Sequence, residues 1–167
     1  MYLKRHVSPE LADEVVSLII AGIALQVEYR RYYPAGEVAA HVIGFVDIDD
    51  NGQEGVELAF DNWLKGAPGR KQVIRDRYGR AVDDVKRISS SEPGKSIRLS
   101  VDRRLQYLTY RTLKAAVLKH NAVAGSAVVL DVDSGEVLAI ANQPSFNVND
   151  RRQLRPGSTR NRAVIDV

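Results

Sequence analysis

The amino-acid sequence predicts an α+β fold, in which helices and antiparallel strands follow one another without a strict βαβ order. Three stretches carry apolar residues at helical spacing, and the segments between them alternate apolar and polar side chains or stay apolar for the length of a strand. At 167 residues, of which 44% are hydrophobic and 7% aromatic, the chain is long enough to bury a core in one or two small domains.

The first element is a helix from Pro9 to about Ile20. Ser8 is placed to cap its amino end, and proline suits the first helical position because its missing N–H would have no partner there. Gly22 ends the helix. Residues 23–29 then alternate apolar and polar side chains, which predicts a strand with one covered face.

The middle of the chain predicts short elements. Residues 38–45 fit a short helix or a short strand, and the pattern leaves both open. Residues 54–65 carry apolar side chains at helical spacing and predict an amphipathic helix docked on a core. Residues 71–75 and 81–88 flank Tyr78-Gly79 and predict a two-stranded ribbon with one exposed face.

Two longer elements follow. Asp102 is placed to cap a helix that extends through His120. Residues 127–132 and 136–141 are β-rich, and Asp133-Ser134-Gly135 between them predicts a tight turn and therefore a hairpin. Because both runs are nearly continuous in apolar character, we expect this hairpin to be buried on both faces or to lie at the centre of a larger sheet. The side chains expected inside the helix are Leu105, Leu108, Leu113 and Val117.

Composition argues against several classes of function. The 24 basic and 21 acidic residues give a formal charge of +3, too balanced for nucleic-acid binding to be expected. With no cysteine there is no disulfide and no cysteine-ligated metal site. The histidines lack ligand spacing, and a calcium-loop pattern that begins at Asp47 has Leu58 where a bidentate glutamate is required, so an acidic turn is favoured and no metal is expected. The arginine-rich run at 151–162 fits a solvated connector better than a site for an anionic partner.

The apolar stretch at residues 15–27 does not predict a membrane span. It falls short of the roughly 20 residues that a helix needs to cross a bilayer. Asp13 and Glu14 lie directly before it. We interpret the stretch as part of a core helix followed by a strand.

Six segments carry a specific combination of motifs. They are RRYYPAGEVAAHVIGFV at 30–46, NGQEGVELAFDNWLKGAPG at 51–69, DRYGR at 76–80, LSVDRRLQYL at 99–108, GSAVVLDVDSGEVLAIANQPSFN at 125–147 and RNRAVIDV at 160–167. Together they resemble the class B penicillin-binding proteins, in particular the division-specific peptidoglycan transpeptidases of Gram-negative bacteria. The resemblance extends over nearly the whole chain, and it favours a short helix at residues 38–45.

The resemblance implies a two-part organisation. Residues 1–121 would form the non-catalytic pedestal, or dimerisation domain. Residues 122–167 would form the start of the transpeptidase domain, with a hairpin at about 126–141 followed by a basic connector. We therefore expect the α+β pedestal domain of a penicillin-binding protein, joined to the first β-hairpin of the transpeptidase domain.

The resemblance also implies where the parent protein works and what it does. An amino-terminal anchor would hold it at the periplasmic face of the bacterial inner membrane. There it would cross-link peptidoglycan by serine acyl transfer from D-Ala-D-Ala stem peptides, and β-lactams would acylate it. We expect Met1 to be an expression start and the chain to be truncated before the catalytic serine. The alternative is a naturally short, pedestal-only adaptor of the division machinery.

We expect the chain itself to be catalytically silent, with no catalytic, cofactor-binding or metal-binding residue. The family uses a Ser-x-x-Lys nucleophile motif followed by Ser-x-Asn and Lys-Ser/Thr-Gly, and no serine in this sequence has a lysine three positions later. Ser145-Phe146-Asn147 spells Ser-x-Asn but lies before the expected place of the nucleophile. A lone serine lacks the adjacent base and the oxyanion donors that acyl transfer needs.

The two arginines and two tyrosines at 30–33 are candidates for a contact with another protein or another domain. Rigid aromatic and arginine side chains anchor protein interfaces, so this patch is a candidate partner contact. The alternative is that it braces the junction between the two domains, with an arginine paired to a carboxylate; both roles can hold. The resemblance points to the division complex as partner, including the glycan-polymerising membrane protein FtsW, and allows a homodimer. Peptidoglycan and β-lactams would bind only the full-length protein. The candidate contact residues are Arg30, Arg31, Tyr32, Tyr33, Glu37 and Glu57.

Overall fold

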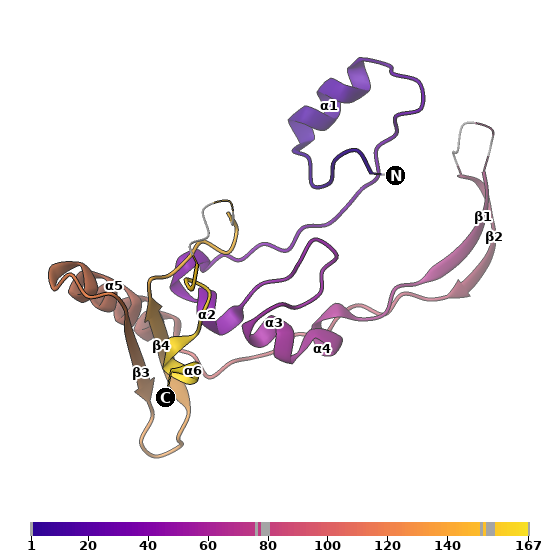
Figure 1. The fold of residues 1–167 in the computed structure, drawn as a ribbon. Coiled ribbons are helices and arrows are strands. Elements are labelled where there is room, and N and C mark those ends of the chain that lie inside the picture. The colour runs from indigo at the N-terminus through magenta and orange to yellow at the C-terminus, as the bar shows by residue number, and fades with distance from the viewer. Residues whose placement is uncertain (1, 76, 78–80, 151, 153–155, 167) are drawn as a thin grey trace. The chain divides into compact units, whose positions relative to one another are not determined.

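The computed structural model describes residues 2–75, 77, 81–150, 152 and 156–166 (Figure 1). Its internal contacts divide the chain into two compact units, Met1–Tyr32 and Tyr33–Val167. The two units are described separately below. No helix among the described residues is long and apolar enough to cross a bilayer.

The first unit contains one helix, α1 (Pro9–Ser17). Its predicted cap is confirmed, since the Ser8 side chain accepts a hydrogen bond from the backbone N–H of Leu11. The predicted strand at 23–29 is wrong: these residues pair with no strand in the described part of the chain. A period-two pattern makes a strand only where a neighbouring strand takes up the backbone hydrogen bonds. Without one, Val27 stays 83% exposed.

The second unit begins with four short helices. The segment left open between helix and strand is helical, as the resemblance favoured. The single helix predicted for residues 54–65 is broken in two at Phe60, whose backbone leaves the helical region (φ −120°, ψ 26°). These helices are η1 (Gly36–Val38), α2 (Ala40–Ile43), α3 (Gly55–Ala59) and α4 (Asp61–Lys65).

The break at Phe60 changes how this region packs. The sequence predicted a continuous apolar stripe docked on a core, but Phe60 is 48% exposed and Trp63 is 50% exposed. Two one-turn helices separated by a non-helical residue do not continue one helical stripe. The ammonium of Lys95 lies 4.2 Å from the centroid of the Trp63 ring, so a cation–π contact covers part of that ring instead.

The predicted pairing of two strands in this ribbon is confirmed. Strands β1 (Arg70–Arg75) and β2 (Ala81–Ser89) pair antiparallel, with register shifts along the ribbon. The predicted turn at Tyr78-Gly79 lies outside the described residues.

The last part of the unit is a helix on a hairpin. Asp102 caps α5 (Arg103–Lys119) as predicted, because its carboxylate accepts the backbone N–H groups of Arg104 and Leu105. Strands β3 (Gly125–Leu130) and β4 (Val137–Gln143) form the predicted antiparallel hairpin, and α5 packs along it (Figure 1). A short helix, α6 (Arg162–Ile165), packs against the same two strands.

Burial of the hairpin is uneven. On β4, Ala139 is fully buried and Ala141 is 2% exposed. On β3, partly buried and exposed positions alternate, and Val128 and Leu130 stay about half exposed. The expectation of burial on both faces is therefore wrong for β3, because α5 covers only one side of a sheet that has two strands in the described chain.

A small apolar core lies where residues 33–46 meet the segment that follows β4. The side chains of Tyr33, Ala40, Phe146 and Val148 are buried together, and Phe45 packs against them. The Phe45 and Phe146 rings meet edge to face with centroids 5.9 Å apart. Residues more than 100 positions apart in the sequence thus share one core.

Candidate functional site

Polar contacts surround the small apolar core of the second unit, and we call them the junction. They connect residues 33–46 with α5, β4 and the described residues 144–150 and 156–163. Tyr33 is 7% exposed and lies at the edge of this core. The Tyr33 hydroxyl accepts the backbone N–H of Val46 at 3.2 Å. The Asn149 side chain accepts the Tyr33 N–H at 3.0 Å and donates to the Tyr33 carbonyl at 2.8 Å. Tyr33 is therefore held by its ring, its hydroxyl and both backbone polar groups.

Glu37 forms the second contact of the junction. Its carboxylate accepts a hydrogen bond from the Tyr110 hydroxyl at 2.5 Å and one from the Lys114 ammonium at 3.1 Å, both on α5. The bond from Tyr110, followed by that from Lys114, holds the pKa of Glu37 below its ordinary value. Burial and then the bond to Glu37 raise the pKa of Tyr110. These contacts therefore favour an ionised Glu37 carboxylate, a neutral Tyr110 hydroxyl and a protonated Lys114 ammonium at neutral pH.

Gln106 on α5 forms the third contact of the junction. It is buried on the inner face of the helix, where the sequence predicted leucine side chains. Its amide nitrogen donates to the carbonyls of Val38 and Ile140 at 2.6 and 2.9 Å, and its oxygen accepts the Ile140 N–H at 2.9 Å. Gln106 is 2% exposed, whereas Leu108, predicted to lie inside, is 58% exposed. A polar side chain can lie on the buried face of α5 because its hydrogen bonds to Val38 in η1 and to Ile140 in β4 satisfy its amide.

The predicted contact residues do not all meet. Tyr33 and Glu37 lie in the junction, and Glu57 is buried on α3. The other three lie exposed in the first unit. Lys114 and Tyr110 hold the Glu37 carboxylate, a pairing that the sequence did not suggest. Partner contact and junction bracing stay predictions for this set. The exposed three are Arg30, Arg31 and Tyr32.

Sequence reasoning missed Gln106, Asn142 and Asn149. Each carries an amide that bonds to a distant segment. The available signal was weak but present, since Gln106 and Asn142 sit among apolar neighbours in a helix and a strand. A polar side chain at a position whose neighbours are buried must find hydrogen-bond partners.

The acidic loop that begins at Asp47 closes on itself. One Asp47 carboxylate oxygen accepts the backbone N–H groups of Asp49 and Asn51 at 2.8 and 2.9 Å. Lys65 donates to the Asn51 side-chain oxygen. In the described part of the chain, no three potential ligand side chains come together in a way that would hold a metal ion. The arrangement is that of an Asx turn.

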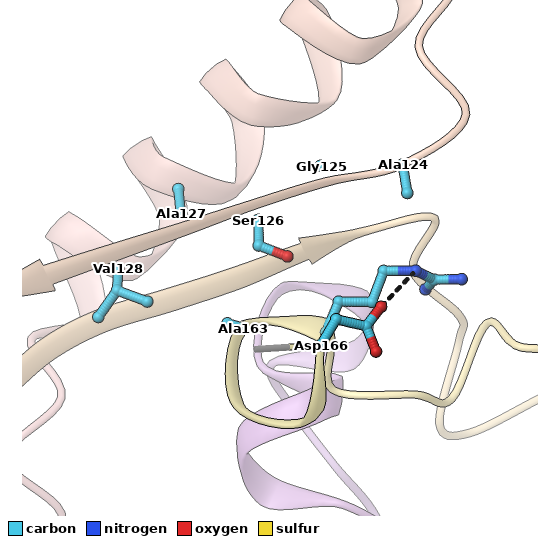
Figure 2. A pocket seen from close by; sticks show the side chains of 8 residues that line it. Ala124, Gly125, Ser126, Ala127, Val128, Ala163 and Asp166 are labelled. Atoms are coloured by element: carbon cyan, nitrogen blue, oxygen red, sulfur yellow. Dashed lines mark ion pairs between the residues drawn. The ribbon is translucent and has the colours of Figure 1, made fainter.

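An open pocket of about 390 Å³ lies between β3 and α6 (Figure 2). The guanidinium of Arg162 and the carboxylate of Asp166 stand 3.9 Å apart at its side, and the backbone of residues 124–128 forms its opposite wall. Ser126 points toward the α6 side in the close-up view. The pocket marks where the carboxyl end of the chain rests on the hairpin.

Comparison with known proteins decides the family. Residues 2–99 match the penicillin-binding protein dimerisation domain, and residues 125–167 match the penicillin-binding protein transpeptidase domain. The chain belongs to the penicillin-binding proteins. The predicted fold class is confirmed: an α+β dimerisation region followed by the start of a transpeptidase domain.

The relatives of this penicillin-binding protein chain are peptidoglycan enzymes by name. It is 48% identical to peptidoglycan D,D-transpeptidase FtsI of Escherichia coli and 43% identical to the probable peptidoglycan D,D-transpeptidase PbpC of Pseudomonas aeruginosa, over its whole length in both cases. It spans 28% and 30% of those two proteins. A crystal structure of a peptidoglycan synthetase from Bifidobacterium adolescentis is similar over 89% of the chain and 28% of its own length, with a TM-score of 0.63 and 26% identity.

The junction has a clear place in this family. Residues 33–46 lie within the dimerisation match, and β4 and Asn149 lie within the transpeptidase match. Helix α5 lies between the two matches. The bonds between Tyr33 and Asn149, and those from Gln106 to Val38 and Ile140, therefore join the two family domains. The Glu37 carboxylate joins the dimerisation match to α5.

Proposed function

We propose that this chain is the non-catalytic scaffold of a septal peptidoglycan D,D-transpeptidase. Residues 1–121 act as the pedestal, and residues 122–167 begin the transpeptidase domain that the pedestal supports. The whole protein cross-links D-Ala-D-Ala stem peptides by serine acyl transfer during cell division and is acylated by β-lactams. The 48% identity to the Escherichia coli FtsI supports this reaction class.

The junction is the observation that carries the scaffold role. The two hydrogen bonds between Tyr33 and Asn149 and the bond from the Ser145 hydroxyl to the Glu37 carbonyl fasten the dimerisation segment to the transpeptidase segment. A buried polar contact is costly to break when one partner is removed, so such contacts hold two segments in a single arrangement. A pedestal that is fixed in this way can position a catalytic domain.

We propose that these 167 residues perform no acyl transfer themselves. The sequence holds no Ser-x-x-Lys motif. The Ser145 hydroxyl, the serine of the Ser-x-Asn sequence, donates to the Glu37 carbonyl at 2.9 Å and so serves the junction. Ser158 is 2% exposed, too buried to meet a peptide substrate. Neither serine has the lysine three positions later that the family's nucleophile motif requires.

The proposed setting is the periplasmic face of the inner membrane, with the division complex as partner. FtsW is the specific partner we propose, and a homodimer through the dimerisation region is a further association. The exposed arginine and tyrosine side chains at 30–32 are suited to such contacts, because interfaces are enriched in these residue types. A pedestal-only adaptor of the division machinery is the second candidate.

Penicillin labelling tests the proposed reaction. The 167-residue chain and a longer form that includes the Ser-x-x-Lys, Ser-x-Asn and Lys-Ser/Thr-Gly motifs are each incubated with a fluorescent penicillin. We expect the longer form alone to be labelled, since only it would carry the activated serine. Labelling of the short chain would refute its catalytic silence. The absence of labelling in both would refute the transpeptidase assignment.

Substitution of two neighbouring tyrosines, Tyr32 and Tyr33, distinguishes contact with a partner protein from bracing of the junction. Tyr32 is 72% exposed and Tyr33 is 7% exposed, so the pair differs in burial but not in chemistry. We expect Tyr32→Ala to weaken FtsW binding and to leave the melting curve unchanged. Tyr33→Ala should lower the melting temperature because it removes a buried ring and a hydroxyl acceptor. Unchanged FtsW binding in both Tyr32→Ala and Arg31→Ala would remove residues 30–32 from the interface.

A further inference from the structure

A buried histidine contacts the carboxyl-terminal part of the chain. His41 on α2 is 6% exposed, and its Nε2 lies 2.8 Å from the carbonyl oxygen of Ser158. Because a carbonyl only accepts, Nε2 carries the proton and donates it. The Phe146 ring meets the imidazole edge to face, with centroids 5.4 Å apart. The ring is thus held between an aromatic side chain and a backbone acceptor, 117 residues away in the sequence.

Three amide and hydroxyl side chains extend this contact to α6. The Asn161 amide donates to the His41 carbonyl at 3.4 Å, and Asn142 donates to the Asn161 oxygen at 2.9 Å. The Asn142 oxygen accepts the Ser126 hydroxyl at 2.7 Å and the Ala163 N–H at 2.8 Å. Asn142 is 1% exposed, so loss of one of these bonds would leave a buried polar atom unsatisfied.

We propose that His41 is a proton-sensitive latch: the neutral ring keeps residues 156–166, the latch segment, on α2 and the hairpin, and a proton on the ring releases that segment. The surroundings of His41 explain the direction. Among the described residues, Arg162 on the latch segment is the charged group that acts on His41. It is a cation, so it opposes a second positive charge.

No carboxylate compensates a protonated ring in the described part of the chain. Glu54 and Glu57 belong to the cap and body of α3, which packs against α2, and neither forms an ion pair with His41. Asp166 on the latch segment is paired with Arg160 and Arg162. A buried imidazolium is therefore relieved only when the segment moves and water reaches the ring.

The sign of the pH effect follows from this geometry. Burial, the largest cause, and Arg162 lower the pKa of His41 from its ordinary value of 6.5, although the bond to Ser158 opposes them. The open state therefore binds a proton more readily than the latched state. The latch is complete above pH 6.5 and is lost as the pH falls from 6.5 toward the lowered pKa of the latched ring.

Amide exchange measured by NMR on the 167-residue chain tests the latch. The probe is the Ala163 N–H, compared with amides of α5 and corrected for the intrinsic pH dependence of exchange. In the unmodified chain we expect the protection of Ala163 to fall below pH 6.5 by at most about tenfold per pH unit, because one proton is linked to opening. The amides of α5 should keep their protection.

Two variants control the experiment. His41→Gln keeps a donor nitrogen but cannot titrate in this range, so the protection of Ala163 should lose its pH dependence. His120→Gln removes an exposed histidine and should behave like the unmodified chain. The latch is refuted if protection in the unmodified chain is flat from pH 7.5 to 5, or if His41→Gln shows the same fall.

The ring itself gives a second measurement that needs no variant. If His41→Gln does not fold, the chemical shifts of the His41 ring in the unmodified chain decide. A ring that titrates below 6.5, at the pH where Ala163 loses protection, supports the latch. A ring that titrates at 6.5 or above overturns it. Both readouts use this chain alone and do not depend on the proposed cross-linking reaction.

Discussion

The Asn149 side chain bonds to both backbone polar groups of Tyr33, as a residue of a neighbouring strand would. Its side-chain oxygen accepts the Tyr33 N–H at 3.0 Å, and its side-chain nitrogen donates to the Tyr33 carbonyl at 2.8 Å. One amide thereby satisfies both polar groups of a residue whose side chain is 7% exposed. The pair connects the two family domains through a single residue on each side.

Removal of this amide should weaken the fold. We expect Asn149→Ala to lower the free energy of unfolding by about 1–3 kcal/mol, because both backbone groups of Tyr33 lose their partners. Urea unfolding monitored by circular dichroism measures the loss. Asn62→Ala is the matched control, since Asn62 is exposed on α4 and should change stability by less than about 0.5 kcal/mol. Equal effects of the two variants would contradict the role of Asn149.

The Glu37 contact predicts a dependence on acid pH. Its pKa is lowered by the bonds from Tyr110 and Lys114, so its contribution to stability is complete above its ordinary value of 4.5 and is lost as the pH falls through the lowered value. Glu37→Gln should cost about 0.5–1 kcal/mol at pH 7, since both charged side chains remain partly exposed.

Urea unfolding at pH 7 and at pH 3 measures the free energy of unfolding of the unmodified chain and of Glu37→Gln. The difference between unmodified chain and Glu37→Gln should shrink at the lower pH. Glu136→Gln changes an exposed carboxylate in the hairpin and should show no such trend. A difference that stays constant with pH would mean that the charge of Glu37 is not what α5 recognises.

Gln106 and Leu108 test which face of α5 is buried. Gln106→Leu should lower the free energy of unfolding by about 2 kcal/mol or more, because backbone groups of Val38 and Ile140 lose their partners in the interior. Leu108→Gln should stay within about 0.5 kcal/mol, because Leu108 is 58% exposed. Thermal unfolding of both variants measures the contrast. The reverse order would restore the leucine face that the sequence suggested.

Alanine substitutions at Gly44 and Gly135 distinguish the cost of a steric clash from the cost of backbone strain. Both adopt a positive φ, 75° and 73°. A Cβ on Gly44 would lie 1.7 Å from the Glu54 carbonyl oxygen, whereas a Cβ on Gly135 would meet nothing within 4 Å. We expect Gly135→Ala to cost about 1 kcal/mol from strain alone, and Gly44→Ala about 3 kcal/mol or more. Chemical denaturation of the two variants gives both numbers, and similar values would show that α2 and α3 can separate without cost.

Local chemistry was predictable from the sequence. The caps at Ser8 and Asp102 and the turn before Glu136 depend on residues within three or four positions, so their side chains already specify the structure. The family resemblance also found the organisation of the chain, since it rests on several motifs at once. The short helix at α2 is a case in which that resemblance decided what the periodicity left open.

Long-range contacts were not predictable in the same way. The alternating pattern at 23–29 lacks a partner strand in the described chain, and the helical stripe at 54–65 breaks at Phe60. Gln106 is inside and Leu108 outside because two backbone segments far away in the sequence offer hydrogen bonds. A pattern along the chain reports how a residue relates to its neighbours, and it carries little information on partners 30 to 120 positions away.

The spacing of the junction has a consequence for synthesis on the ribosome. Tyr33 cannot form its bonds to Asn149 until 116 further residues are synthesised, and His41 cannot meet Ser158 until 117 further residues are synthesised. At translation rates of 5–20 residues per second, this gap corresponds to about 6–23 s. During that time the apolar side chains at 33–46 lack their core partners Phe146 and Val148, so we expect the nascent chain to expose to chaperones an apolar segment that becomes buried once residues 146–149 have emerged.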